Sequence, residues 1–285
     1  MMKKAVLSII YFTFLMLTAC DKDSSTPSTG NNGDGGNNNP IPPKEIVETM
    51  PAVLSVVNKS VGTNCNGFYQ AVPVGYNATT TKYPLLIFLH GQGELGNGTT
   101  DLSKVLNNGT PSILKKKAFP PNFEIKGKNY SFIVLMPQFT KWPSADDVQA
   151  MIDYAVQTYS IDKTRIYVAG LSMGGGVTWM HASKYAPKVA AIVTMAGAAK
   201  LSDANAKEIV TSKLPVWSFH NQDDKTVDVS YTINNIAKLN SYSPVIAPKV
   251  TYWPTGGHDS WTKPSDPAYK ENGINIYEWM LQYSR

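Results

Sequence analysis

Apolar residues in this chain gather into short continuous runs, which alternate with segments of helical spacing. Strands that are buried on both faces of a sheet give such runs. They occupy 85–90, 132–136, 166–169, 190–195, 216–219 and 250–253. Apolar positions recur every three or four residues in between, which predicts helices over 102–114, 145–159, 177–185, 231–239 and 273–283. The alternation predicts an α/β fold, with a mostly parallel sheet and helices on both faces.

Two earlier runs, 52–61 and 67–74, flank a turn rich in Gly and Asn and predict an opening antiparallel hairpin. With this hairpin the expected sheet has eight strands, all within one folded domain over residues 44–285. Cys65 lies in the polar turn of the hairpin, without a His and an Asp at a motif spacing. We therefore interpret Cys65 as a structural or incidental thiol.

The start of the chain does not follow this pattern. A positively charged beginning and thirteen mostly apolar residues, 5–17, lead to Cys20, and this apolar run is too short to span a bilayer. The arrangement resembles a bacterial lipoprotein signal, which implies removal of residues 1–19 and lipidation of Cys20. An ordinary secretory signal is the alternative. Residues 20–43, rich in Gly, Asn, Ser and Pro, predict a flexible tether. We expect a protein lipid-anchored to a bacterial membrane, on the periplasmic side or at the cell surface.

Charge and histidine content narrow the candidate chemistry. The net charge of +5 is small and scattered, and nothing in the chain resembles a nucleic-acid-binding module, so we expect no nucleic-acid partner. None of the four histidines has metal-ligand spacing, so we expect no metal and no cofactor.

Residues 170–174 read Gly-Leu-Ser-Met-Gly, between an apolar run and a helical segment. In a strand–turn–helix context this pattern is typical of a nucleophile elbow, where the glycines leave room for a very sharp turn. Ser172 is therefore a candidate nucleophile. The alternative is a Gly-rich turn in which this serine only caps the helix.

A serine hydroxyl needs a base to remove its proton during attack. His258, in an irregular Gly-Gly-His-Asp segment, is the candidate base, whereas His220 ends a predicted strand and fits a structural hydrogen bond better. An acid must also hold the imidazole. Asp223 and Asp224 are adjacent candidates, and only one of them can face His258.

The order of these residues carries a resemblance. Ser172 follows the fifth strand, the motif LHGQGELG (89–96) includes the exit of the third, and Asp224 and His258 follow the seventh and eighth. This order resembles the α/β-hydrolase superfamily over nearly the whole folded domain. The segments AGLSMGGG, PVWSFHNQDD and GGHDSW resemble bacterial feruloyl esterases, acetylxylan esterases and polyhydroxybutyrate-depolymerase-like proteins. Asn221 stands where that group often has glycine, so we expect that turn to differ slightly.

The resemblance implies the remaining parts of an active site. The family's spacing from His220 favours Asp224 over its neighbour as the acid. An oxyanion hole needs two backbone N–H donors, which would come from Met173 and Gln92. Glu94 either braces the loop that carries Gln92 or is solvated.

Two tryptophans and one loop bear on the substrate. Trp142 and Trp261 are expected at the end of the sheet where ligands bind in open α/β folds. Each of them either forms a wall of the substrate site or packs against its own loop. Residues 196–214 leave room for only one short helix, so we expect an open cleft without a large lid.

Together these features predict a cofactor-free serine esterase outside the cytoplasm. Its expected substrates are short acyl or hydroxycinnamoyl esters on polysaccharides. Two alternatives remain at this point: a serine peptidase of the same fold, and a non-catalytic surface glycan-binding lipoprotein.

Overall fold

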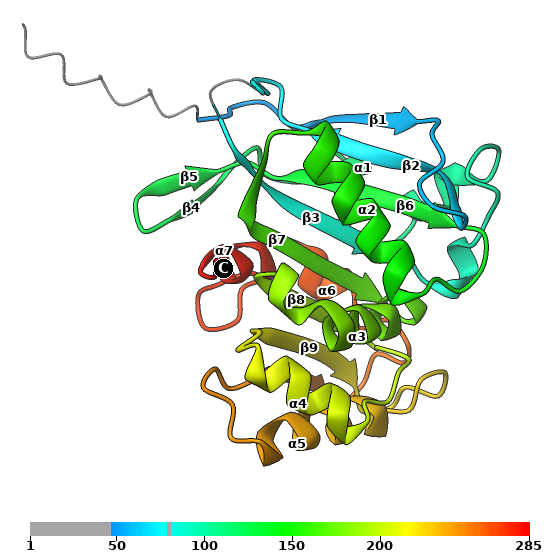
Figure 1. Cartoon of the computed structure of the whole chain (residues 1–285), viewed down its shortest axis with the longest axis vertical. Helices are drawn as coiled ribbons and strands as arrows, with labels where there is room; N and C mark the ends of the chain where they lie inside the picture. Colours follow the sequence, from blue (N-terminus) through cyan, green and yellow to red (C-terminus); the bar gives the residue numbers. More distant parts are fainter. Residues whose placement is uncertain (1–46, 79–80) are drawn as a thin grey trace, which may run out of the picture. The chain divides into compact units, whose positions relative to one another are not determined.

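The computed structural model describes residues 47–78 and 81–285 (Figure 1). The expected signal segment (1–19), the lipidation site at Cys20 and the tether (20–43) lie outside the described residues. Within the described ranges, no helix has the length and apolar character needed to cross a membrane.

The main sheet has eight strands in the order β1-β2-β6-β3-β7-β8-β9-β10. β1 pairs antiparallel with β2, and β2 with β6, whereas all pairs from β6 to β10 are parallel. The expected eight-stranded, mostly parallel α/β fold is therefore confirmed. The strands are β1 Val53–Val57, β2 Cys65–Val72, β3 Tyr83–Leu89, β6 Ile133–Phe139, β7 Ile161–Leu171, β8 Ala191–Met195, β9 Val216–Asn221 and β10 Lys249–Trp253.

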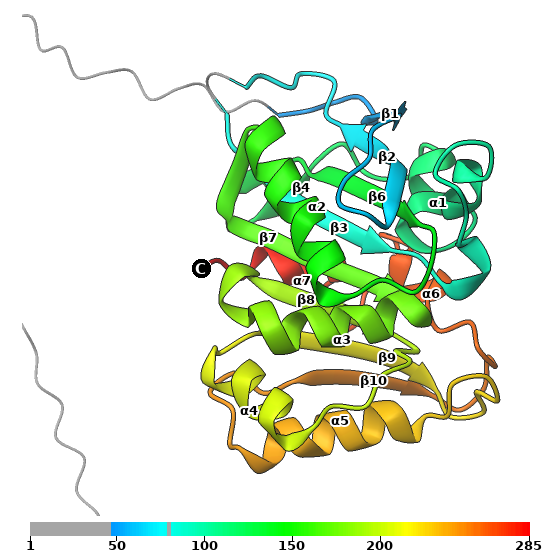
Figure 2. The same cartoon turned by 45° about the vertical axis from the view of Figure 1, so that its right-hand side comes forward.

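Helices cover both faces of this sheet. Figure 2 shows α2, α3, α4 and α5 in front of the strands, and their apolar side chains share one core cluster with Leu85, Ile87 and Leu89 of β3. Leu86 and Phe88 of the same strand point into a second cluster with α1 and α7, as the two-residue period of a strand requires. The helices are α1 Gly109–Lys115, α2 Ala145–Thr158, α3 Met173–Tyr185, α4 Asp203–Thr211, α5 Ser230–Ser241, α6 Thr262–Ser265 and α7 Ile276–Leu281, with 3₁₀ turns at Gln92–Glu94, Leu102–Leu106 and Ala186–Lys188.

The segment 102–114, expected as one helix, is broken. A 3₁₀ turn, Leu102–Leu106, is followed by Asn107 and Asn108, and α1 begins only at Gly109. Gly109 has φ +60°, and a β-carbon there would lie 2.3 Å from the ring of Phe88. The backbone thus changes direction where only glycine fits, while the apolar spacing that predicted one helix continues across the break.

Other local differences involve short or half-exposed elements. A hairpin of β4 (Phe123–Ile125) and β5 (Lys128–Tyr130) was not expected, because three-residue strands carry too little pattern. α7 starts at Ile276, since the side chain of Asn275 caps the helix by accepting the N–H groups of the second and third helical residues.

The interpretation of Cys65 as a turn residue was wrong. Cys65 is the first residue of β2 and is buried. Burial raises the pKa of its thiol to about 11. A thiol with so high a pKa is almost wholly protonated at neutral pH, which makes it a poor nucleophile.

Candidate active site

Ser172 lies on the turn between β7 and α3, with φ 51° and ψ −116°. The turn is tight because β-carbons cannot fit around it. A β-carbon on Gly170 would lie 2.5 Å from the backbone of Gly174, and one on Gly174 would lie 2.2 Å from the carbonyl oxygen of Leu89. The Gly-x-Ser-x-Gly pattern is therefore required by close backbone contacts, and it presents the serine above the end of the sheet.

The backbone of Ser172 is held from the neighbouring strand. Its N–H donates to the carbonyl of Met195, at the end of β8, over 2.8 Å. Its carbonyl accepts the N–H groups of Gly176 at 2.9 Å and Ala198 at 3.1 Å. These bonds fix the strained turn to the end of β8, to the first turn of α3 and to Ala198 of the β8–α4 loop.

The side chains of Ser172, His258 and Asp224 come from three different loops and form a hydrogen-bonded chain. His258 Nε2 lies 2.8 Å from Ser172 Oγ, and its Nδ1 lies 2.7 Å from Asp224 Oδ2. Because a carboxylate only accepts, Nδ1 carries the proton and Nε2 is free to accept the serine proton. The imidazole is half-buried and Asp224 is buried. The three residues form the serine–base–acid chain that nucleophilic catalysis needs.

The carboxylate of Asp224 is fixed by several donors. Its Oδ1 accepts the N–H groups of Thr226 at 2.8 Å and Val227 at 3.0 Å. His220 packs behind it, with Nε2 3.4 Å from Oδ2. His220 donates this Nε2 proton to the carbonyl of Val227, while its Nδ1 accepts the hydroxyl of Thr232. Burial lowers the pKa of His220, so it stays neutral and acts as a structural support.

Two side chains at and just after the end of β9 hold the loop that carries the histidine. Asp223 accepts the N–H of Gly257 at 2.8 Å and, less closely, that of Gly256 at 3.3 Å. Asn221 donates from Nδ2 to the carbonyl of Gly257 at 3.0 Å. The residue that departs from the family pattern thus ties the two loops together.

Two backbone N–H groups beside Ser172, those of Gln92 and Met173, have no acceptor among the described residues and can bind an oxyanion. Met173 is the first residue of α3, and the first amides of a helix lack intrahelical partners and form the positive end of its dipole. The N–H of Gln92 donates to no atom of the described residues. Both residues line the cavity above Ser172.

His90 determines where the amide of Gln92 points. Its Nε2 accepts the N–H of Phe139 at 3.0 Å, so Nε2 carries no proton. Burial lowers the pKa of His90 to about 4, so the ring is neutral and its one proton lies on Nδ1. Nδ1 donates to the carbonyl of Gly91 at 2.7 Å. In a trans peptide the N–H lies opposite the carbonyl, so the Gln92 N–H points away from His90.

Glu94 braces the same loop from the other side. One carboxylate oxygen accepts the N–H of Gly91 at 2.6 Å, and the other accepts Asn108 Nδ2 at 2.5 Å. Burial raises the pKa of Glu94 above its usual range. Asn108 in turn accepts Trp261 Nε1 at 3.4 Å, and the Trp261 ring meets the His258 ring edge-on at 5.0 Å. These contacts connect the oxyanion loop to the histidine loop.

Two cavities share Gln92, Ser172 and Thr226. The Trp261 pocket, of about 330 Å³, is also lined by Gly91, Gly93, Glu94, Asn107, Asn108, Leu171, His258 and Trp261. The Trp142 pocket, of about 270 Å³, is also lined by Trp142, Met173, Ala198, Val227 and Tyr231. The two tryptophans therefore lie in different pockets beside the serine, and an ester bound at Ser172 has room for one part in each.

The family profile described as phospholipase/carboxylesterase matches residues 76–264, more than half of the chain. The chain belongs to this family. Its members are hydrolases of the α/β-hydrolase fold, which agrees with the sheet order described above. No curated protein matches this chain.

Solved structures resemble this fold at low sequence identity. A thermostable esterase shows a TM-score of 0.57 and 22% identity; the alignment covers 82% of this chain but only 64% of that one. The fluorophosphonate-binding serine hydrolase FphF of Staphylococcus aureus shows a TM-score of 0.56 and 16% identity; the alignment covers 81% of this chain and 99% of that one. A feruloyl esterase module of Clostridium thermocellum, complexed with sinapinate, shows a TM-score of 0.54 and 16% identity; the alignment covers 82% of this chain and 90% of that one.

The structure brings together all the residues that the sequence singled out for the chemistry, Ser172, Asp224, His258, Gln92 and Met173. Several supporting residues were missed, namely His90, Asn108, Asn221, Thr226 and Tyr231. His90 lies within LHGQGELG, whose position after the third strand could have indicated its role, and Asn221 was noted only as a departure from the family pattern. The rest reach the site from segments without a motif. Among the described residues, no group of three or more His, Cys, Asp or Glu is arranged to hold a metal ion.

Proposed function

We propose that this chain is a serine carboxylesterase that acts outside the cytoplasm on short acyl or hydroxycinnamoyl esters of polysaccharides. The observation that carries the proposal is the bonded chain from Ser172 Oγ through His258 to Asp224, beside the free N–H groups of Gln92 and Met173. A binding protein needs no such chain.

Acylation follows from this geometry. Ser172 Oγ attacks the ester carbonyl carbon as its proton passes to His258 Nε2. Asp224 stabilises the imidazolium that forms. The carbonyl oxygen becomes an oxyanion and accepts the N–H groups of Gln92 and Met173. His258 then gives its proton to the leaving alkoxide oxygen, the C–O bond breaks, and the alcohol departs.

Deacylation repeats these steps with water as the nucleophile. His258 removes a proton from a water molecule, whose oxygen attacks the acyl-enzyme carbonyl. The second tetrahedral intermediate uses the same two N–H donors. Collapse breaks the bond to Ser172 Oγ, which recovers its proton from His258, and the carboxylic acid is released.

The shape of the site supports small acyl groups. Between β8 and β9 the chain forms only α4, and the charged side chains of this segment at Lys200, Asp203, Lys207 and Glu208 are exposed. The cleft is thus open, and we propose that it lacks a long acyl tunnel. Pockets of a few hundred cubic ångströms beside two tryptophans suit an acetyl or an aromatic acyl group. A feruloyl esterase module among the similar structures agrees with this choice.

The proposed location rests on the sequence of residues 1–43. A short apolar segment ending at Cys20 and a polar tether would place the enzyme on a membrane surface, within reach of polysaccharide. Incorporation of labelled palmitate into the wild-type protein, and its loss in Cys20→Ser, would test this anchor.

The activity is tested with ester substrates of different size and with a peptide anilide. The purified protein should hydrolyse p-nitrophenyl acetate and feruloylated oligosaccharides, with rates that fall steeply for p-nitrophenyl esters longer than about eight carbons. It should leave a peptide anilide intact. Cleavage of the anilide with no ester hydrolysis would favour the peptidase alternative, and no turnover of any substrate would favour the binding protein.

A further inference from the structure

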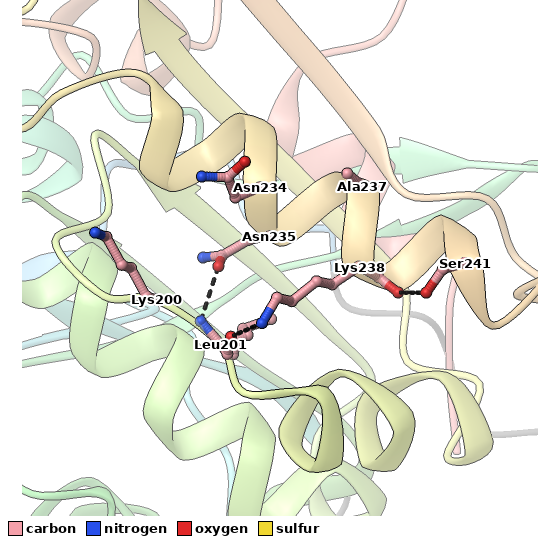
Figure 3. Close-up of a pocket in the computed structure, with 7 residues that line it drawn as sticks. All are labelled: Lys200, Leu201, Asn234, Asn235, Ala237, Lys238 and Ser241. Atoms are coloured by element: carbon pink, nitrogen blue, oxygen red, sulfur yellow. Dashed lines mark hydrogen bonds between the residues drawn. The ribbon is translucent and has the colours of Figure 1, made fainter.

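A groove on the flank of the molecule, separate from the two pockets at Ser172, has no role in the chemistry above. It encloses about 400 Å³ between the β8–α4 loop and helix α5 (Figure 3). The loop contributes Lys200 and Leu201, and α5 contributes Asn234, Asn235, Ala237, Lys238 and Ser241.

The groove is held in shape by buried hydrogen bonds. Asn235 is buried; its Oδ1 accepts the N–H of Leu201 and its Nδ2 donates to the carbonyl of Ala199, both at 2.8 Å. Lys238 Nζ donates to the carbonyl of Leu201 at 2.9 Å and pairs with Asp203 at 3.3 Å. Figure 3 shows these side chains reaching from the helix to the loop. The loop and α5 therefore keep the groove in one shape before any ligand binds.

The same two elements line the Trp142 pocket beside Ser172. Ala198 of the loop and Tyr231 of α5 belong to that pocket. Tyr231, Asn234 and Lys238 follow the i, i+3, i+7 spacing of one helical face. Lys200 bridges the two cavities, because its Nζ lies 4.7 Å from the centre of the Tyr231 ring. The groove thus lies next to the Trp142 pocket and extends roughly 10 Å along α5, at 1.5 Å per residue.

Two polar groups in the groove remain available to a ligand. Asn235 and Lys238 are engaged in holding the loop, but the exposed amide of Asn234 makes no hydrogen bond with any described residue. Lys200 is exposed, and its ammonium pairs with no carboxylate of the described chain. An open groove with the Tyr231 ring beside it, an unbonded amide and a cation that pairs with no described carboxylate complements a hydroxyl-rich chain that carries negative charge.

We infer that this groove binds the saccharide part of the substrate, and that Lys200 selects chains bearing a carboxylate, such as a uronic acid, near the esterified sugar. The acyl group then lies in the Trp261 pocket, and the saccharide runs from Ser172 past Trp142 and Tyr231 to Lys200. The inference rests on the proposed esterase function and specifies its substrate as an acidic polysaccharide.

The test compares acetylated xylo-oligosaccharides with and without a glucuronic acid branch, at low salt. The wild-type protein should show a higher kcat/KM on the acidic substrate. Lys200→Gln should lower that kcat/KM about two- to fivefold through KM, the effect of one exposed ion pair. Lys200→Glu should lower it further, and added salt should reduce the wild-type preference. Lys207→Gln, which removes an exposed charge of α4 outside the groove, should change nothing.

p-Nitrophenyl acetate keeps the two proposals apart, because it cannot reach the groove and requires only the machinery at Ser172. If the wild-type protein hydrolyses p-nitrophenyl acetate but does not distinguish the two oligosaccharides, the groove inference is wrong and the esterase stands. An unchanged preference in both Lys200 variants would also overturn the inference. If p-nitrophenyl acetate is not hydrolysed, the proposed function fails; titration of the protein with the acidic oligosaccharide then tests the groove by binding alone.

Discussion

Asp223 accepts the backbone N–H of Gly257 through Oδ1 at 2.8 Å, so its carboxylate holds the histidine loop and not the histidine ring. Its neighbour Asp224 makes the 2.7 Å contact with His258 Nδ1. Two adjacent and chemically identical side chains are thus divided between orienting the imidazole and positioning the loop that carries it.

This division predicts different costs for the same substitution. Asp224→Asn should lower kcat by about 10⁴, because an amide favours the wrong imidazole tautomer. Asp223→Asn keeps an acceptor oxygen for Gly257 and should have a much milder effect. Rates on p-nitrophenyl acetate, with circular dichroism to check folding, would measure both. The opposite ranking would show that Asp223 is the acid.

Ser172→Ala should abolish the nucleophile without unfolding the protein. By analogy with serine proteases, turnover should fall by about 10⁶. A fluorophosphonate probe followed by peptide mass spectrometry should label the wild-type protein at Ser172 alone. Ser183→Ala, on the same helix but directed at the carbonyl of Trp179, is the matched control and should retain activity and labelling. Labelling at any other residue would overturn the assignment.

Glu94 should act through position. Glu94→Gln replaces one acceptor oxygen by an NH₂ group, which must face either the N–H of Gly91 or the amide of Asn108. The oxyanion loop would then shift, and kcat should fall on the order of 10- to 100-fold with little change in KM. Glu124→Gln, at an exposed position in β4, provides the control. An unchanged kcat would mean that the loop keeps its shape without this carboxylate.

The two tryptophans should affect different parts of the substrate. With the acyl group in the Trp261 pocket, Trp261→Ala should lower the rate on feruloyl esters more than on acetyl esters of the same alcohol. Trp142 is 49% exposed, and Trp142→Ala should lower kcat/KM on oligosaccharide esters but not on p-nitrophenyl acetate. Each variant is the control for the other. Equal losses on all substrates would indicate that both rings only pack their loops.

Stability should decrease in mild acid because of buried histidines. Burial lowers the pKa of His90 to about 4 and that of His181 to about 3, from 6.5 in the unfolded chain. Below pH 6.5 the unfolded state binds more protons than the folded state. Each pH unit of acidification therefore lowers the free energy of unfolding by about 1.4 kcal/mol for each histidine. The loss continues down to the folded pKa values.

Denaturant titrations between pH 7 and pH 5 would measure this slope. His181→Gln should reduce this slope by the contribution of one histidine, because glutamine does not titrate. The new amide can still donate to Gln149, the partner of His181 Nε2. Carboxylates that titrate in the same range are common to both proteins and cancel in the comparison. Identical slopes would contradict the assignment of a depressed pKa to His181.

The fold was predictable because its central strands are buried on both faces. Continuous apolar runs such as 85–90 are typical of strands buried on both faces, and their alternation with segments of helical spacing predicted the α/β class. The pattern gave no warning of β4 and β5, whose three-residue strands are half exposed, nor of the break at Gly109, where a close contact with Phe88 decides the geometry.

The reacting residues were foreseeable for a different reason. Few residue types can act as nucleophile, base or acid, so Ser172, His258 and the pair Asp223 and Asp224 stand out even in a single sequence. The choice of Asp224 within that pair came from the family's spacing. A residue that only positions another needs a hydrogen-bonding group and a side chain of the right length. Any amide or imidazole that meets these two conditions could serve. Asn108 and Asn221 are of this kind, and their partners become known only when distant loops are brought together.

The anchoring of Ser172 has a consequence for heat inactivation. A non-glycine residue held at φ 51° costs on the order of 1–3 kcal/mol, which the surrounding structure must outweigh. Here that compensation comes from bonds to Met195, Gly176 and Ala198. Once the β8–α4 loop loosens, the turn can relax to an ordinary conformation that withdraws the hydroxyl from His258. Heated enzyme should therefore lose activity at a temperature where its sheet is still intact, and recover it on cooling.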